Sequence, residues 1–333
     1  MYPKTGQLWI FLALSTQIMA QNALPEVVSG KIERIENFQS KYVAAKNIDI
    51  WLPQGYSDAT KYAVLYMQDG QALYDPSQSW SKQSWDIDDV ASELLSAHTI
   101  KNFIVVGIWN GGQTRHAEYF PQRPFERLTP VEKDTIAAQL ERAARTKDAF
   151  YPQSDKYLQF MVKELKPFIE QKYSVKTNRE NTFVAGSSMG GLISLYALCE
   201  YPNVFGGAAC LSTHWLGTFT SENNPIPGAF IKYLTKRLPH PGKHKIYFDC
   251  GDQTLDALYP NIQREVDSVM KSKKYTESHW VTKYFPGEDH SEKSWHKRLH
   301  FPLLFLLGQN NDSQSKAPNV IRTSLNDPTN RCR

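Results

Sequence analysis

The chain has 333 residues, of which 41% are hydrophobic, 22% charged and 12% aromatic, with 18 Gly and 19 Pro. This composition excludes a collagen-like, low-complexity or wholly disordered chain. The net charge of +4 arises from 38 basic and 34 acidic residues, and the positive charges are scattered. Because no Lys/Arg block stands out, we expect neither a nucleic-acid partner nor a membrane-surface patch.

The first twenty residues have the pattern of a secretory signal peptide. Lys4 lies in a short polar start, residues 8–14 form an apolar run, and the small residue Ala20 follows. The run is too short to span a bilayer, so we expect cleavage after Ala20 and export of the protein to the periplasm or the medium. No later stretch approaches a membrane span. Residues 309–333 are polar and aperiodic, which predicts a flexible tail.

Strand-like and helix-like runs alternate through the rest of the chain. Two β-rich runs, at 27–38 and 43–52, predict an opening antiparallel hairpin. Apolar runs predict further strands at 63–67, 103–109, 182–185, 207–211, 245–250 and 280–285. Periodicity predicts helices at 87–97, 157–172, 192–198, 230–238, 262–270 and 295–307. The alternation indicates an α/β fold, with a mostly parallel sheet of about eight strands and helices on both faces.

Residues 121–152 interrupt this alternation. The segment has Pro at both ends, many charges and one helical stretch at 131–145. We interpret it as an insertion into a single domain spanning residues 21–308, and such long surface segments usually act as a lid or pocket wall.

The clearest chemical motif is Gly186-Ser187-Ser188-Met189-Gly190, which matches G-x-S-x-G. A predicted strand precedes it and a predicted helix follows, which is the strand–turn–helix context of a nucleophile elbow. The glycines permit a sharp turn, so Ser188 is expected to project its hydroxyl as a nucleophile.

A serine nucleophile needs a base, and the base needs an orienting acid. On a sheet of this kind they follow the serine in the order acid, then histidine. Of the nine histidines, His290 is the one in a loop between the last strand and the last helix. The acid should follow the strand at 245–250, where Asp252 and Asp256 both satisfy the order.

The oxyanion of an acyl-transfer reaction needs hydrogen-bond donors. The backbone N–H of Met189 follows the nucleophile and is one candidate donor. The second should come from the loop after the third strand, where Gln71 is the candidate. His214 and Trp215 follow the end of the strand at 207–211, so we expect them to line the substrate pocket.

The sequence predicts no metal site and no cofactor. His296 and His300 have the i, i+4 spacing of a zinc pair, but Lys297 stands where a metalloprotease has Glu. The four cysteines have neither metal-site spacing nor the pattern of a disulfide framework. Gly111-Gly112 lacks the fingerprint of a dinucleotide site.

Four segments carry a family resemblance: LYMQDGQ at 65–71, VAGSSMGG at 184–191, YFDCG at 247–251 and FPGEDHSEKSW at 285–295. With them, the chain resembles the putative-esterase family of α/β-hydrolases over about residues 26–308. That family includes siderophore, feruloyl and acetylxylan esterases, S-formylglutathione hydrolase and mycolyltransferases.

The resemblance implies an α/β-hydrolase fold and a serine ester hydrolase that acts through an acyl-enzyme. Its nucleophile corresponds to Ser188, its base to His290 and its second oxyanion donor to Gln71. It also favours Asp256 over Asp252 as the acid. The implied substrate is a siderophore ester or an acetylated or feruloylated carbohydrate. An acyltransferase with the same triad, or a binding protein without catalysis, are the alternatives.

Overall fold

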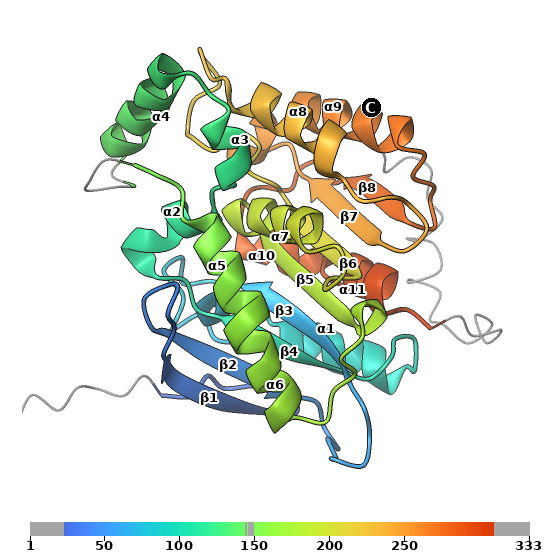
Figure 1. The fold of residues 1–333 in the computed structure, drawn as a ribbon. Coiled ribbons are helices and arrows are strands. Elements are labelled where there is room, and N and C mark those ends of the chain that lie inside the picture. The colour runs from blue at the N-terminus through green and yellow to red at the C-terminus, as the bar shows by residue number, and fades with distance from the viewer. Residues whose placement is uncertain (1–22, 144, 146–149, 310–333) are drawn as a thin grey trace, which may run out of the picture.

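A sheet of eight strands forms the centre of the protein (Figure 1). The computed structural model describes residues 23–143, 145 and 150–309. Within them the strands are β1 Lys31–Phe38, β2 Lys46–Leu52, β3 Ala63–Gln68, β4 Phe103–Ile108, β5 Thr182–Ser187, β6 Gly207–Leu211, β7 Lys245–Cys250 and β8 Trp280–Tyr284. Their order in the sheet is β1-β2-β4-β3-β5-β6-β7-β8. The predicted signal peptide and residues 310–333 of the predicted tail lie outside the described residues.

The strand pairing confirms the predicted α/β sheet. β2 is antiparallel to both β1 and β4, which includes the predicted opening hairpin, and the remaining pairs are parallel. Parallel strands place their carboxyl ends at one edge of the sheet, where the crevice of an open α/β sheet forms. The loops after β3, β5, β6, β7 and β8 therefore all lie at that edge.

Helices cover both faces of the sheet. They are α1 Ile87–Ser96, α2 Arg115–Tyr119, α3 Gln122–Glu126, α4 Pro130–Arg142, α5 Ser154–Phe160, α6 Lys166–Lys172, α7 Met189–Glu200, α8 Ile226–Arg237, α9 Pro260–Ser272, α10 Glu292–Arg298 and α11 His300–Leu307. In β3, Val64 and Tyr66 join a core that contains α7 residues, whereas Leu65 and Met67 join one that contains residues of α1 and α11. Successive side chains of a strand point to opposite faces, and burial of both faces explains the continuous apolar runs.

Two predicted helices are interrupted in the structure. The helix predicted at 157–172 consists of α5, a π-helical turn at Met161–Leu165 and α6, in which Pro167 occupies the first turn. The helix predicted at 295–307 is divided at Leu299 into α10 and α11. Pro302 follows that division and cannot donate to the carbonyl four residues earlier. Hydrophobic periodicity in the sequence predicts which face of a helix is buried, but it does not predict such local interruptions.

The predicted insertion at 121–152 contains α3 and α4 in its described part. Phe125 of α3 packs edge-on against Phe120 and Phe150, with ring centroids 5.8 Å and 5.7 Å away. The helix α4 lies at the periphery of the molecule (Figure 1). A lid or pocket-wall role for this segment stays a prediction. None of the helices in the described ranges combines the length and apolarity needed to cross a membrane.

Candidate active site

Ser188 lies in a strained turn between β5 and α7. Its backbone has φ 56° and ψ −124°, a conformation that non-glycine residues rarely adopt. A Cβ on Gly186 would lie 2.7 Å from the backbone of Gly190, so the turn requires glycine there. The backbone N–H of Ser188 donates to the Leu211 carbonyl of β6 (2.9 Å). The predicted strand–turn–helix elbow is therefore present, with Ser188 at its tip.

Two backbone N–H groups lie beside this turn on neighbouring segments. Met189 is the first residue of α7, and the first N–H groups of a helix have no intrahelical acceptor. Gln71 is in the 3₁₀ turn Gly70–Ala72 after β3, where Ala72 N–H makes the bond to the Asp69 carbonyl (2.9 Å). β3 and β5 are adjacent and parallel, so both turns lie at the same sheet edge.

Hydrogen bonds and an ion pair of Asp69 fix the position of the loop that carries Gln71. The carboxylate of Asp69 accepts bonds from Arg115 Nε and Nη2, each 2.7 Å long, and from Asn110 Nδ2 at 2.7 Å. Asp69 itself has a left-handed φ of 57°. This paired carboxylate, 5% exposed, fixes the turn next to the candidate oxyanion donor.

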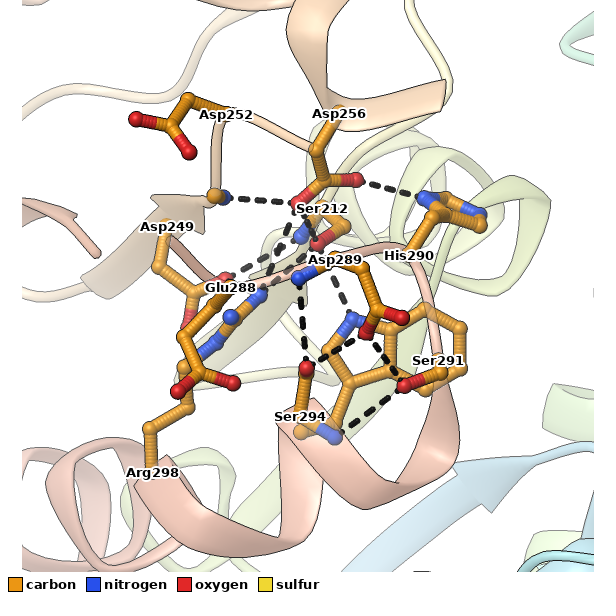
Figure 2. Close-up of polar contacts among 12 residues, drawn as sticks. Ser212, Asp249, Asp252, Asp256, Glu288, Asp289, His290, Ser291, Ser294 and Arg298 are labelled. Atoms are coloured by element: carbon orange, nitrogen blue, oxygen red, sulfur yellow. Dashed lines mark hydrogen bonds and ion pairs between the residues drawn. The ribbon is translucent and has the colours of Figure 1, made fainter. Parts of the chain in front are cut away.

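His290 and Asp256 are in direct contact. The Nδ1 atom of His290 lies 2.6 Å from Oδ1 of Asp256, whose side chain is fully buried (Figure 2). Asp256 lies in the 3₁₀ turn Thr254–Leu258 after β7, and His290 in the loop between β8 and α10. Thr254 Oγ1 accepts the backbone N–H of His290 (3.0 Å), which ties the two loops together.

Asp252 is directed away from His290 (Figure 2). Its carboxylate accepts the N–H of Gly287 (2.8 Å) and the hydroxyl of Tyr284 (2.8 Å). Hydrogen bonds from the Gln253 side chain and from these two groups lower the pKa of Asp252. The structure thus brings Asp256 to the imidazole and gives Asp252 a loop-organising position.

Tyr259 contacts both His214 and His290. Its hydroxyl is 2.7 Å from Nδ1 of His214, and its ring centroid is 5.8 Å from that of His290. Burial raises the pKa of Tyr259 well above its usual value, and a hydrogen bond with Ser188 opposes that rise. Within the described residues, no direct hydrogen bond joins Ser188 to His290. Such catalytic bonds are often long before substrate binds.

Comparison with known proteins supplies the family. The family model described as Putative esterase matches residues 44–308. The chain belongs to this family. It is an ester hydrolase with the α/β-hydrolase fold.

Individual relatives of this esterase are distant in sequence. It is 22% identical over 272 residues to the uncharacterized protein YbbA of Bacillus subtilis, covering 80% of this chain and 94% of that one. It is 24% identical over 236 residues to an endo-1,4-beta-xylanase/feruloyl esterase of Xylanibacter ruminicola, covering 68% and 26% of the two chains.

Solved structures share the fold of this esterase. A ferulic acid esterase is similar with a TM-score of 0.59 and 18% identity, covering 83% of this chain and 98% of that one. The enterobactin esterase FES from Shigella flexneri is similar with a TM-score of 0.61 and 15% identity, covering 85% and 60%.

Two residues that we expected at the pocket of this esterase are buried. Trp215 is in the core, where its indole N–H donates to Gln263 of α9 (3.0 Å), and its place on the pocket wall stays a prediction. His214 is also buried, and burial lowers its pKa well below 6.5. Its imidazole contacts the Tyr259 hydroxyl, and its backbone N–H donates to the backbone carbonyl of Ser188 (3.1 Å).

Sequence reasoning missed three residues close to this site: Tyr259, Ser212 and Arg298. Ser212 and Arg298 contact Asp256, at 2.6 Å and 3.8 Å. None of the three belongs to a recognisable motif, and Arg298 is 42 positions after Asp256 (298 − 256). Tyr259 is near the acid because its backbone N–H donates to the Asp256 carbonyl (3.0 Å), whereas Arg298 reaches the acid because α10 packs against the turn after β6, where it bonds Ser212 (2.8 Å).

Proposed function

We propose that this esterase works through an acyl-enzyme, with Ser188 as nucleophile, His290 as general base and Asp256 as the acid that orients His290. The observation that carries the proposal is the 2.6 Å contact between His290 Nδ1 and the fully buried Asp256 carboxylate. That contact holds the Nδ1 proton, so Nε2 is left as the acceptor for the serine proton. The strained elbow at Ser188 supports the nucleophile's role.

The reaction proceeds in two balanced steps. The Ser188 oxygen attacks the ester carbonyl carbon while His290 takes the serine proton, and the N–H groups of Met189 and Gln71 stabilise the oxyanion. His290 then donates this proton to the leaving alcohol as the ester C–O bond breaks. Water repeats the sequence on the acyl-enzyme, which releases the carboxylic acid and restores Ser188.

We further infer that the substrate carries an aromatic acyl group, such as a feruloyl or catecholate ester. Two exposed aromatic rings contact residues around the site: the Phe219 ring, 43% exposed, lies 5.4 Å from the His214 ring, and the Trp80 ring, 56% exposed, lies 5.7 Å from the Arg115 guanidinium. Exposed rings of this kind can stack on a planar acyl group. The names of the feruloyl, ferulic acid and enterobactin esterases among the similar proteins agree with this class.

The test is a release assay on feruloyl, catecholate and acetyl esters, run on the wild type and on Ser188→Ala. We expect the aromatic esters to have the highest kcat/KM and the variant to be inactive on all of them. Equal rates on acetyl esters would contradict the aromatic acyl group. An ester product formed with an added alcohol or sugar would instead assign the chain as an acyltransferase.

We also propose that the protein is exported, as the signal-peptide pattern predicts. Expression in a bacterial host followed by N-terminal sequencing of the periplasmic and extracellular fractions tests this. A mature chain that begins at Gln21 is the expected result, and an intact Met1 recovered only from the cytoplasm would refute it.

A further inference from the structure

A buried polar cluster lies behind Asp256, on the side of its carboxylate opposite His290 (Figure 2). Oδ1 of Asp256 faces His290, whereas Oδ2 accepts the N–H of Gly251 (2.6 Å) and the hydroxyl of Ser212 (2.6 Å). The guanidinium of Arg298 lies 3.8 Å from the same Oδ2. Every part of this cluster is shielded from solvent, since Ser212 and Asp256 are fully buried and Arg298 is 2% exposed.

The direction of the Ser212 hydroxyl proton is determined by its neighbours. Trp295 Nε1 and Arg298 Nη2 both approach Ser212 Oγ, at 2.9 Å and 2.8 Å. Indole and guanidinium nitrogens can only donate, so these two bonds use the lone pairs of the hydroxyl oxygen. The hydroxyl proton is then left for Asp256 Oδ2. Ser212 therefore acts as a one-way donor, and its bond to Asp256 requires an acceptor oxygen there.

The backbone of Ser212 is held as firmly as its side chain. Its φ of 41° lies in the left-handed region, which is uncommon for serine. Its N–H donates to the carbonyl and to the carboxylate of Asp249, at 3.0 Å and 3.1 Å. The residue before it, Leu211, accepts the backbone N–H of Ser188. One turn after β6 thus contacts the elbow on one side and the acid on the other.

The positive charge of Arg298 also neutralises a second buried carboxylate, that of Asp249. Its Nη2 lies 3.0 Å from Oδ1 of Asp249, a fully buried residue of β7. Burial raises the pKa of Asp249, and the positive charge of Arg298 opposes that rise. Two buried carboxylates repel each other, and a cation within reach of both offsets that repulsion. Arg298 supplies that cation and at the same time orients the Ser212 hydroxyl.

We propose that Ser212 is a positioning residue of this esterase, which holds the Asp256 carboxylate so that Oδ1 points at His290 Nδ1. This inference rests on the proposed Ser188–His290–Asp256 mechanism. Ser212 and Gly251 anchor Oδ2 from two directions and prevent rotation of the carboxylate. The imidazolium that forms during attack then meets a fixed negative charge without rearrangement, which is the condition for efficient electrostatic stabilisation.

The test is Ser212→Ala, which keeps the backbone and removes one donor to Asp256. We expect kcat to fall about tenfold to a hundredfold, the range for hydrogen bonds to charged groups, with KM within about twofold. The far-downfield proton resonance of the His290 Nδ1–H should weaken or shift. Ser174→Ala is the matched control: it removes a buried hydroxyl, bonded to the Asp58 carbonyl (2.7 Å), far from the site.

A double-mutant cycle separates positioning from a general structural effect. If Ser212 acts through Asp256, Ser212→Ala should cost little further activity in an Asp256→Asn background. Equal losses in the two backgrounds would overturn the inference, as would an unchanged kcat and proton resonance for Ser212→Ala in the wild type. Should the alanine variant unfold, Ser212→Cys keeps a group of similar shape but a much weaker donor, and serves the same comparison.

The same cycle distinguishes this inference from the mechanism on which it rests. If Asp256→Asn retains wild-type activity, the proposed triad is wrong, and the role of Ser212 fails with it. If Asp256→Asn is inactive while Ser212→Ala is fully active, the triad stands and only the positioning role is lost.

Discussion

Replacing Asp256 with Asn should invert the hydrogen bonding of His290. Two donors, the Gly251 N–H and the Ser212 hydroxyl, converge on Oδ2, each at 2.6 Å. An amide at this position must present its carbonyl oxygen to them, which turns its NH₂ group toward His290. Nδ1 of His290 would then have to accept a bond instead of donating one, so the proton moves to Nε2. With its proton on Nε2, the imidazole cannot take the proton of Ser188.

The expected loss is about 10⁴ in kcat, the magnitude found when a triad acid is replaced by its amide and the wrong tautomer results. It corresponds to roughly 5 kcal/mol of transition-state stabilisation. The assay is hydrolysis of p-nitrophenyl acetate at a fixed pH, with circular dichroism as a check on folding. Asp256→Asn keeps the shape of the side chain, so the protein should remain folded.

Asp252→Asn is the matched control, since it makes the same chemical change in the same loop. Its carboxylate contacts Gly287 and Tyr284 but not His290, so we expect a loss of only a few-fold. Inactivation by Asp252→Asn with retention of activity in Asp256→Asn would refute the assigned geometry. A loss below about tenfold in both variants would instead indicate a Ser188–His290 dyad.

Three further predictions follow from local geometry. Ser188→Ala should lower turnover of p-nitrophenyl acetate by on the order of 10⁴ or more and abolish labelling by a fluorophosphonate, with an unchanged circular dichroism spectrum; near-normal turnover would exclude this nucleophile. Gly251→Ala should lower kcat about 10²-fold, because a Cβ there would lie 2.0 Å from the Glu288 carbonyl and push apart the loops that carry the acid and the base. Gly228→Ala in α8 meets nothing within 4 Å and should be active, and a fully active Gly251→Ala would contradict the reasoning. His116 is buried with its pKa lowered by burial to about 4, so the unfolded chain binds a proton near pH 6.5 and the folded chain only near pH 4. The stabilisation that the neutral His116 gives the folded protein is complete above pH 6.5, and the free energy of unfolding falls by roughly 3 kcal/mol as the pH falls toward 4. Urea unfolding at a series of pH values should show this decline. A His116→Gln variant with the same decline would argue against it.

Much of the site could be predicted because its signals are local. The elbow requires a strand, a turn with small residues and a helix within about twenty positions. Residues 182–200 contain the sequence patterns of all three, one directly after another. The rule that parallel strands share one carboxyl edge then places the loops after β3, β5, β7 and β8 together. His290 could be chosen among the histidines because it lies in the loop between the last strand and the last helix, after the candidate acids in chain order, whereas His214, which also follows a parallel strand, precedes them.

The family resemblance favoured Asp256 as the acid, but local sequence patterns do not separate it from Asp252, and the contact with His290 is seen only in the tertiary structure. Asp252 and Asp256 are four positions apart in one loop, and both satisfy the chain order. The backbone N–H groups of Asp252 and Gln253 both donate to the Glu288 carbonyl at 3.1 Å, so the loop crosses over the one that bears His290. That crossing turns Asp252 outward and Asp256 inward. Such a contact joins residues 36 positions apart (288 − 252), and no local pattern records it.

The sequence by itself determined the fold class, the elbow at Ser188 and the loop of the base, because short-range periodicity and turn chemistry specify where strands, turns and helices begin and end. Only the tertiary structure decided which aspartate meets His290, that Trp215 belongs to the core, and that Ser212 and Arg298 lie behind the acid. These are questions of side-chain direction and of contacts between distant segments. They depend on how α9 and α10 pack against the rest of the protein. The energy of that packing is the sum of many small contacts, and no sequence motif marks the residues that make them.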